Sequence, residues 1–109
     1  MKQYEIWWGN LPAPAGRRPV LLLSRDAAYP YLNKFVVVEI TSTIRGIAEE
    51  VRLGRQEGLP KPCVANCDNL RTIPRSALVR KAGALPAARH VEVKRALGHA
   101  LAWTELIEL

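Results

Sequence analysis

The chain has 109 residues, a length that suits one domain with a single core. Its 49% apolar and 24% charged residues are ordinary for a soluble globular protein, and no apolar run is long enough to span a membrane. The first residues lead directly into strand-like sequence, which predicts no signal peptide. A net charge of +6 favours a polyanionic partner through phosphate contacts and counterion release, but it does not say which polyanion.

Four strands are predicted in the first half of the chain. Tyr4–Asn10 is rich in aromatic and β-branched residues, which are typical of strands. Pro19–Ser24 is an apolar run, which predicts burial on both faces, and Lys34–Ile40 has the strongest strand pattern in the chain. After a turn, Glu49–Leu53 is predicted as a further strand. Leu11–Gly16 is a loop, because its prolines lack the N–H group that a strand ladder needs.

The second half contains further strands and one helix. Residues 62–73 are strand-like at both ends and polar in the middle, and residues 77–85 form another strand after a turn at Pro74. Pro86 suits the first turn of a helix, which is predicted to run through roughly Trp103. The apolar stripe of this helix consists of Val93, Leu97, Ala100 and Leu101. Together these elements predict a mostly β fold with an α-helix at its C-terminal end, in which five to six antiparallel strands close partly into a small barrel, within a single domain over residues 1–109.

The cysteines and histidines do not form a recognisable metal-binding pattern. Cys63 and Cys67 have the spacing C-x3-C with no second pair, and His90 and His99 lie far along the chain on the predicted helix. We therefore expect two reduced thiols and no structural zinc. No glycine-rich phosphate loop and no G-x-S-x-G motif is present either, so we expect no metal and no cofactor.

Arg18 and the hydroxyl-bearing residues Thr41–Thr43 are the best candidates for a chemical site. Arg18 directly precedes one predicted strand, and its planar, permanently charged guanidinium suits phosphate groups. Thr41–Thr43 directly follows another predicted strand. If these two strands are antiparallel neighbours, Arg18 and Thr41 lie at the same edge of the sheet. A guanidinium beside a hydroxyl suits phosphoryl chemistry that needs no metal.

Each of these residues also has a simpler interpretation. Arg18 can be a solvated surface charge, and hydroxyl groups at a strand end commonly bond to nearby backbone. A third polar group, Asp68 and Asn69 with Arg71, lies between apolar segments and has no assigned chemistry from the pattern alone. The residues by themselves leave these alternatives open.

Four blocks of the sequence nevertheless resemble a known family. Glu5–Trp8, Arg18–Arg25, Ile40–Gly46 and Val64–Ile73 are similar, in this order, to successive blocks of the MazF/PemK type toxins of bacterial toxin–antitoxin systems. Each block alone is weak, but four in register over nearly the whole chain make the resemblance specific.

The resemblance implies a fold and an activity. The family has a small antiparallel SH3-like or CcdB-like barrel and forms homodimers in the cytoplasm. Its members are sequence-specific, metal-independent endoribonucleases that cleave single-stranded RNA, usually mRNA. The 2′-hydroxyl attacks the adjacent phosphate, and a cognate antitoxin protein neutralises the enzyme. The family's catalytic arginine falls on Arg18 and its catalytic threonine on Thr41.

The resemblance also implies which residues contact RNA, and it leaves the proton transfer open. The expected RNA-binding residues are Arg17, Ser42, Asp68, Asn69 and Arg71. Many members carry a Glu or His in a longer loop before the Arg-Pro block, whereas residues 11–17 are short and contain neither. Because a neutral hydroxyl is a poor base, Thr41 is expected to orient the reacting groups. Residues 104–109 run past the usual family end, and their role stays open.

Two rival functions remain at this point. The first is a non-enzymatic toxin of the same fold that inhibits DNA gyrase by binding the protein, since a fold alone does not fix a function. The second is a nucleic-acid-binding module that has lost catalysis. The pairing of Arg18 with Thr41 favours the nuclease, because a protein-binding surface has no need of it.

Overall fold

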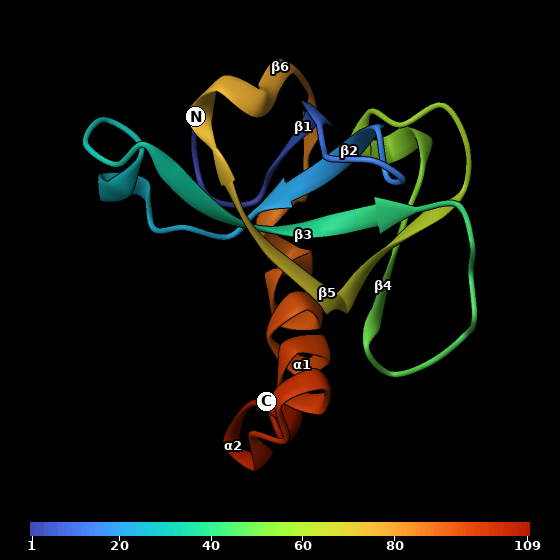
Figure 1. The fold of residues 1–109 in the computed structure, drawn as a ribbon. Helices are drawn as coiled ribbons and strands as arrows, with labels where there is room; N and C mark the ends of the chain where they lie inside the picture. Colours follow the sequence, from blue (N-terminus) through green and yellow to red (C-terminus); the bar gives the residue numbers. More distant parts are fainter.

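A computed structural model describes residues 1–109 and contains one six-stranded antiparallel sheet with a helical hairpin at its C-terminal end (Figure 1). The strand order is β4-β5-β3-β2-β1-β6. The elements are β1 (Glu5–Asn10), β2 (Arg17–Leu22), β3 (Lys34–Thr41), β4 (Glu50–Leu53), β5 (Cys63–Pro74), β6 (Leu78–Ala84), α1 (His90–Leu101) and α2 (Thr104–Ile107). The predicted class, a small antiparallel barrel-like sheet with a C-terminal helix, is confirmed. No helix is long and apolar enough to cross a membrane.

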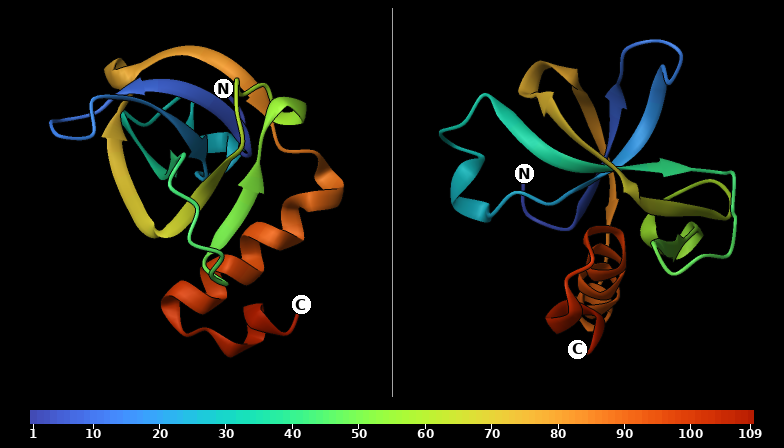
Figure 2. Two further views of the ribbon diagram at one scale, coloured as in Figure 1. Left: turned by 90° about the vertical axis from the view of Figure 1, so that its right-hand side faces the viewer. Right: turned by 60° about the horizontal axis from the view of Figure 1, so that its bottom comes forward.

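The sheet curls into a half-barrel because β5 bends sharply against β3. Val38 pairs with Leu70 and Ile40 pairs with Ala65, so a step of two residues on β3 corresponds to a step of five on β5. The extra residues of β5 cannot pair and bend the strand, as a large bulge does. The views in Figure 2 show the strands curving around a common interior, with α1 against one side. The polar middle of residues 62–73 is therefore a bend within one continuous strand.

Buried apolar residues lie on both faces of the sheet. Leu21 of β2 belongs to a cluster of 13 buried residues that includes Val93 of α1. Its neighbours Val20 and Leu22 belong to a second cluster of seven, on the other face. Successive side chains of a strand point to opposite faces, so a strand buried on both faces must be apolar throughout. The expectation of two buried faces is confirmed for β2, although the strand ends at Leu22, two residues earlier than predicted.

The C-terminal helix is shorter than predicted and is followed by a second one. A 3₁₀ turn, Ala87–Arg89, precedes α1, and α1 ends where Ala102 adopts a left-handed conformation with φ of 56°. The Trp103 N–H then donates to the Gly98 carbonyl at 2.9 Å, and α2 folds back on α1. A Cβ atom on Gly98 would lie 2.8 Å from the Ile107 nitrogen, so glycine permits this close approach. The tail beyond residue 103 thus forms a hairpin with α1.

Candidate active site

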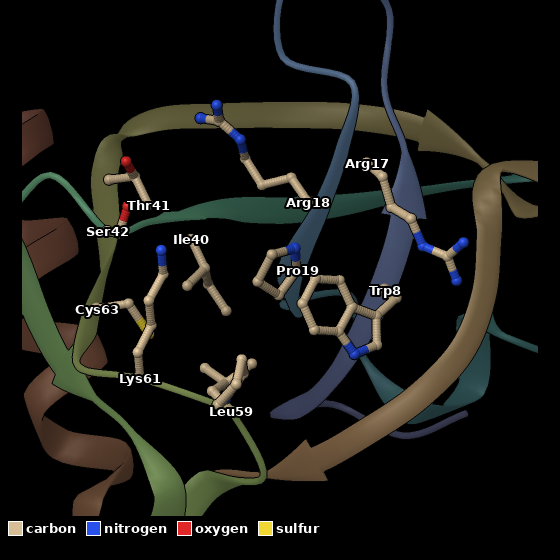
Figure 3. Close-up of a pocket in the computed structure, with 11 residues that line it drawn as sticks. Trp8, Arg17, Arg18, Pro19, Ile40, Thr41, Ser42, Leu59, Lys61 and Cys63 are labelled. Carbon is tan, nitrogen blue, oxygen red and sulfur yellow. The ribbon is translucent and has the colours of Figure 1, made fainter.

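A cavity of about 330 Å³ opens beside the ends of β2 and β3 (Figure 3). Three segments line it: the middle of the β1–β2 hairpin, the end of β3, and the chain that leads into β5. The lining residues are Trp8, Arg17, Arg18, Pro19, Ile40, Thr41, Ser42, Leu59, Pro60, Lys61 and Cys63. The cavity therefore combines charged and hydroxyl groups with apolar side chains.

The register of β2 and β3 brings Arg18 and Thr41 together. Val20 pairs with Glu39 in this antiparallel ladder, and continuing the register by two residues sets Arg18 opposite Thr41. The two residues share the face of the sheet to which Val20 and Glu39 belong, because cross-strand partners point the same way. The predicted neighbourhood of Arg18 and Thr41 is thus present in the structure.

Arg18 differs from the prediction in its local position. It was expected just ahead of a strand, but β2 begins at Arg17, and Arg18 pairs with Gly9 of β1. Pro19 is tolerated inside β2 because the pairing with β3 begins only at Val20, so no ladder bond from Pro19 to β3 is lost. The strand therefore holds the backbone of Arg18 on one side, and its side chain is free to reach the cavity.

Thr41 and Ser42, at the end of β3, line the cavity, and the Thr41 hydroxyl also contacts the local backbone. Thr41 Oγ1 accepts a hydrogen bond from the Thr43 N–H at 3.2 Å, as expected for a hydroxyl at a strand end. Thr41 is half-buried and Ser42 is exposed. The Thr41 hydroxyl keeps its own proton for donation, so the local contact and a role toward a bound group are compatible.

A buried carboxylate joins Arg18 to Arg71. Glu39 is 8% exposed. Its Oε1 lies 3.4 Å from Nη1 of Arg18, and its Oε2 lies 2.7 Å from Nε of Arg71. The side chains of Arg18 and Arg71 are 32% and 35% exposed, so each guanidinium remains open to solvent on its far side. Arg71 therefore reaches the site through Glu39 and does not line the cavity itself.

Lys61 adds a second cation across the cavity from Arg18. In Figure 3 its side chain extends toward Ser42 and Thr41, and the carbon side chains of Leu59, Ile40 and Trp8 also line the cavity. Arg17 points the opposite way from Arg18, as neighbours in a strand do (Figure 3). The cavity therefore combines two cations, Arg18 and Lys61, and the Thr41 hydroxyl with apolar side chains. This combination suits a phosphodiester with an attached base or sugar.

The segment that carries Leu59 and Lys61 is anchored to the rest of the chain by Glu57. The Glu57 carboxylate is 4% exposed, accepts the Gly54 N–H at 2.7 Å and lies 3.3 Å from Nη1 of Arg89. Gly58 has φ of 88°, and a Cβ atom there would lie 2.1 Å from the Ala82 oxygen. Glycine is thus required for this segment to pack directly on β6.

The structure brings together only part of the predicted site. Arg17, Arg18, Thr41 and Ser42 line one cavity, and Arg71 joins them through Glu39. Asp68 and Asn69 lie at the bend of β5, are exposed, and do not line this cavity. Three residues in or beside the cavity were not predicted from the sequence: Trp8, Glu39 and Lys61. Only Glu39 gave a signal, as a single acid inside the apolar run of β3.

The cysteines and His90 have packing roles. Both thiols are free and buried. Burial, with smaller effects from Asp68 and Glu49, raises the pKa of Cys67 to about 12, and burial also raises the pKa of Cys63. His90 stacks on Tyr4 with ring centroids 3.5 Å apart. No group of three or more His, Cys, Asp or Glu side chains is placed to hold a metal ion.

Comparison with known proteins identifies the family. Residues 2–101 match the model of the PemK-like, MazF-like toxin of type II toxin–antitoxin systems. The chain belongs to this family. This MazF-like toxin is 42% identical over 83 residues to the Endoribonuclease MazF3 of Mycobacterium tuberculosis, an alignment that covers 76% of this chain and 81% of the relative.

Solved structures give the same result for the fold. The Mycobacterium tuberculosis toxin MazF-mt6 superimposes with a TM-score of 0.85 and 38% identity, covering 90% of this chain and 96% of that one. An endoribonuclease in complex with its cognate antitoxin, from a mycobacterial species, superimposes with a TM-score of 0.83 and 26% identity, covering 94% and 96%. The expectation of a MazF/PemK type toxin is confirmed.

Proposed function

We propose that this MazF-like toxin is a sequence-specific endoribonuclease that cleaves single-stranded RNA, chiefly mRNA in the cytoplasm, without a metal ion. Residues 1–109 act as one toxin domain, and the active form is a homodimer. The observation that carries the proposal is the pairing of Arg18 with Thr41 across β2 and β3, at the mouth of a cavity that also holds Lys61. Relatives at about 40% identity that are named endoribonucleases support it.

Arg18 and Lys61 bind the scissile phosphate in this proposal. The transition state gathers negative charge on the non-bridging oxygens, and fixed cations in a partly enclosed site stabilise that charge. Arg18 offers a planar set of donors that can contact two oxygens, whereas Lys61 offers a compact charge on a flexible stem. Arg17, Ser42 and Arg71 contact neighbouring parts of the RNA, and Asp68 and Asn69 contact it farther away, at the bend of β5.

The reaction is an attack by the 2′-hydroxyl oxygen on the adjacent phosphorus. The bond from phosphorus to the 5′-oxygen of the next nucleotide breaks, which gives a 2′,3′-cyclic phosphate and a free 5′-hydroxyl. Thr41 orients the reacting groups through its hydroxyl. Residues 11–17 contain no Glu or His, so in this proposal water takes the 2′ proton and water returns one to the 5′-oxygen.

The same surface fits the proposed regulation by an antitoxin. A cognate antitoxin with an acidic segment would meet Arg17, Arg18, Lys61 and Arg71, all of which lie in or beside the cavity. Binding there would exclude RNA, because one patch of cations cannot hold two anionic chains. A related endoribonuclease has been solved with its cognate antitoxin, which supports this part of the proposal.

The test is RNA cleavage in the presence of EDTA. The purified chain is incubated with a mixed pool of single-stranded RNAs, and the new ends are mapped. We expect cuts at a recurring short sequence, with cyclic phosphate and 5′-hydroxyl ends. An RNA pool left intact at high protein concentration would contradict the proposal. Growth inhibition that disappears with a resistant gyrase, while mRNA stays intact, would instead support the protein-binding alternative.

A further inference from the structure

Glu39 is an acidic residue in the most apolar strand of the molecule. Its neighbours Val37, Val38 and Ile40 are at most 1% exposed, and Glu39 itself is 8% exposed. Removing a carboxylate from water is costly, and pairing it with cations often recovers no more than an apolar residue of the same size would supply. Stability is therefore a weak reason for an acid at this position, and a role in the site is a stronger one.

Arg18, Glu39 and Arg71 lie on three adjacent strands and on one face of the sheet. Val20 pairs with Glu39, and Val37 pairs with Arg71. Arg18 from β2, Glu39 from β3 and Arg71 from β5 therefore point to the same side, in a row across the strands. Thr41 follows Glu39 by two residues and shares this side. The alignment is a consequence of register, and a slip of one residue would destroy it.

Both oxygens of the Glu39 carboxylate are occupied by arginine donors. Oε2 forms an ion pair with Nε of Arg71 at 2.7 Å, and Oε1 accepts a hydrogen bond from Nη1 of Arg18 at 3.4 Å. The contact with Glu39 is the only side-chain hydrogen bond of Arg18 in the molecule. The shorter contact, the ion pair with Arg71, holds the carboxylate from the β5 side, and the carboxylate then limits where the guanidinium of Arg18 can go.

Most donors of Arg18 stay available for a phosphate. A guanidinium has five N–H groups, and Glu39 uses one of them. The far side of Arg18 is open to solvent, at 32% side-chain exposure. In Figure 3 the Arg18 side chain extends toward β5, the strand that carries Arg71, along the same side of the cavity as Thr41. The contact holds the guanidinium without covering it.

We propose that Glu39 is a positioning residue, which holds Arg18 at the geometry that the scissile phosphate needs and is itself held by Arg71. This proposal rests on the proposed ribonuclease function. Glu39 acts through Arg18 and takes no proton, because neither of its oxygens faces the cavity unpartnered. A preorganised cation accelerates the reaction more than a mobile one, since no reorganisation is needed when charge develops.

The first experiment is a double-mutant cycle on RNA cleavage. Glu39→Gln keeps the shape and one acceptor oxygen but removes the charge. We expect it to lower kcat about 10- to 100-fold with little change in KM, because misplacing a catalytic group affects the transition state more than substrate binding. In an Arg18→Ala background the same substitution is expected to change kcat less than twofold.

The matched control is Glu5→Gln on β1. Glu5 is also a poorly exposed, ion-paired acid of the sheet, 3.1 Å from the amino group of Lys81, and it lies outside the cavity. We expect this variant to cleave RNA like the wild type. An equal loss in both variants, or a full Glu39→Gln effect that persists without Arg18, would show a merely structural role and overturn the proposal.

The second experiment does not depend on cleavage. In wild-type protein labelled with ¹⁵N-arginine, the Nε–H signal of Arg71 is expected to exchange slowly with water compared with the exposed Arg45. Phosphate titration should shift the Arg18 signal, and Glu39→Gln should weaken that response at least threefold. If wild-type protein leaves RNA intact, the proposed function fails, while these signals still decide whether Glu39 holds Arg18. Rapid Arg71 exchange in the wild type would overturn the pairing itself.

Discussion

The two most buried acidic residues of this toxin are paired with arginine in different ways. Glu39 lies beside the cavity at 8% exposure, and Glu57 lies in the segment before β5 at 4% exposure. Both need a cation because a buried, unpaired carboxylate is very costly. The two sites differ in whether the remaining N–H groups of the paired arginine contact the chain or stay free.

Most donors around Glu57 contact other groups of the chain itself. Glu57 accepts the Gly54 N–H and contacts Arg89. Arg89 also donates to the carboxylate of Glu92 at 2.8 Å and to the Arg52 carbonyl at 2.6 Å. This closed network attaches the segment between β4 and β5 to the start of α1. Its function is structural, since Arg89 directs its donors to Glu57, Glu92 and the Arg52 carbonyl.

Around Glu39, most N–H groups of Arg18 and Arg71 remain available to a ligand. Arg18 and Arg71 each give one contact to the carboxylate and keep about a third of their side-chain surface exposed. The comparison shows that an ion pair alone does not distinguish structure from function. The number of donors that the cation leaves unused makes the difference. Three predictions test this distinction.

The largest expected effect is the loss of activity in Arg18→Ala. Removing one charge-stabilising donor typically costs about 10²- to 10³-fold in rate. We expect a loss of that size in RNA cleavage, with an unfolding midpoint in urea close to that of the wild type, because Glu39 stays paired with Arg71. Arg25→Ala is the control, since Arg25 is exposed and outside the cavity. Equal activities of the two variants would remove Arg18 from the catalytic site.

The next effect is a loss of stability in Arg89→Ala. This change leaves Glu57 buried without its cation, and breaking a buried pair costs roughly 3 kcal/mol in the free energy of unfolding. Urea denaturation followed by circular dichroism measures it. Arg55→Ala, in the same segment but exposed, should change stability little. Cleavage per folded molecule is expected to fall less than in Arg18→Ala, because only the placement of Lys61 is affected. A stable but inactive Arg89→Ala variant would contradict the structural role.

The smallest effect is a loss of stability in acid from Glu92. The Arg89 hydrogen bond outweighs burial and, with the charges of Arg89 and Arg95, lowers the pKa of Glu92. A carboxylate with a lowered folded-state pKa stabilises the fold above its unfolded pKa of about 4.3, and this contribution disappears as the pH falls through the folded value. We expect the free energy of unfolding of Glu92→Gln, measured by urea denaturation, to fall less steeply than that of the wild type between about pH 5 and pH 3. The change is small because the side chain is 42% exposed.

The pattern of apolar residues along the sequence predicted most of the strands. Alternating or continuous apolar residues located β1, β3 and β6 to within about two residues at each end, because side-chain periodicity depends only on neighbours in the sequence. The bend of β5 was not predicted, since it results from unequal pairing with β3. The end of α1 was also missed: Ala102 carries no helix-stopping signal, and the close packing of α2 on Gly98 is a tertiary contact.

The candidate site was predictable in part. Arg18 and Thr41 could be paired because each flanks an apolar run, and two consecutive antiparallel strands bring the start of one beside the end of the other. Lys61 lies in a loop with no pattern, and its place in the cavity depends on the Glu57–Arg89 contact across 32 residues of sequence. Asp68 and Asn69 were assigned to the site by the family resemblance, but the bend of β5 leaves them outside the cavity.

By itself, the sequence determined the fold class, the family and the pair Arg18 and Thr41, because these depend on residue order and on the register of consecutive strands. Only the tertiary structure decided that Glu39 joins Arg18 to Arg71. β3 and β5 are neighbours in the sheet although β4 lies between them in the chain, so no local pattern could align their charges. The short loop before Arg18 still supplies no acid or base, and the cavity opposite it, with Lys61, supplies the second cation.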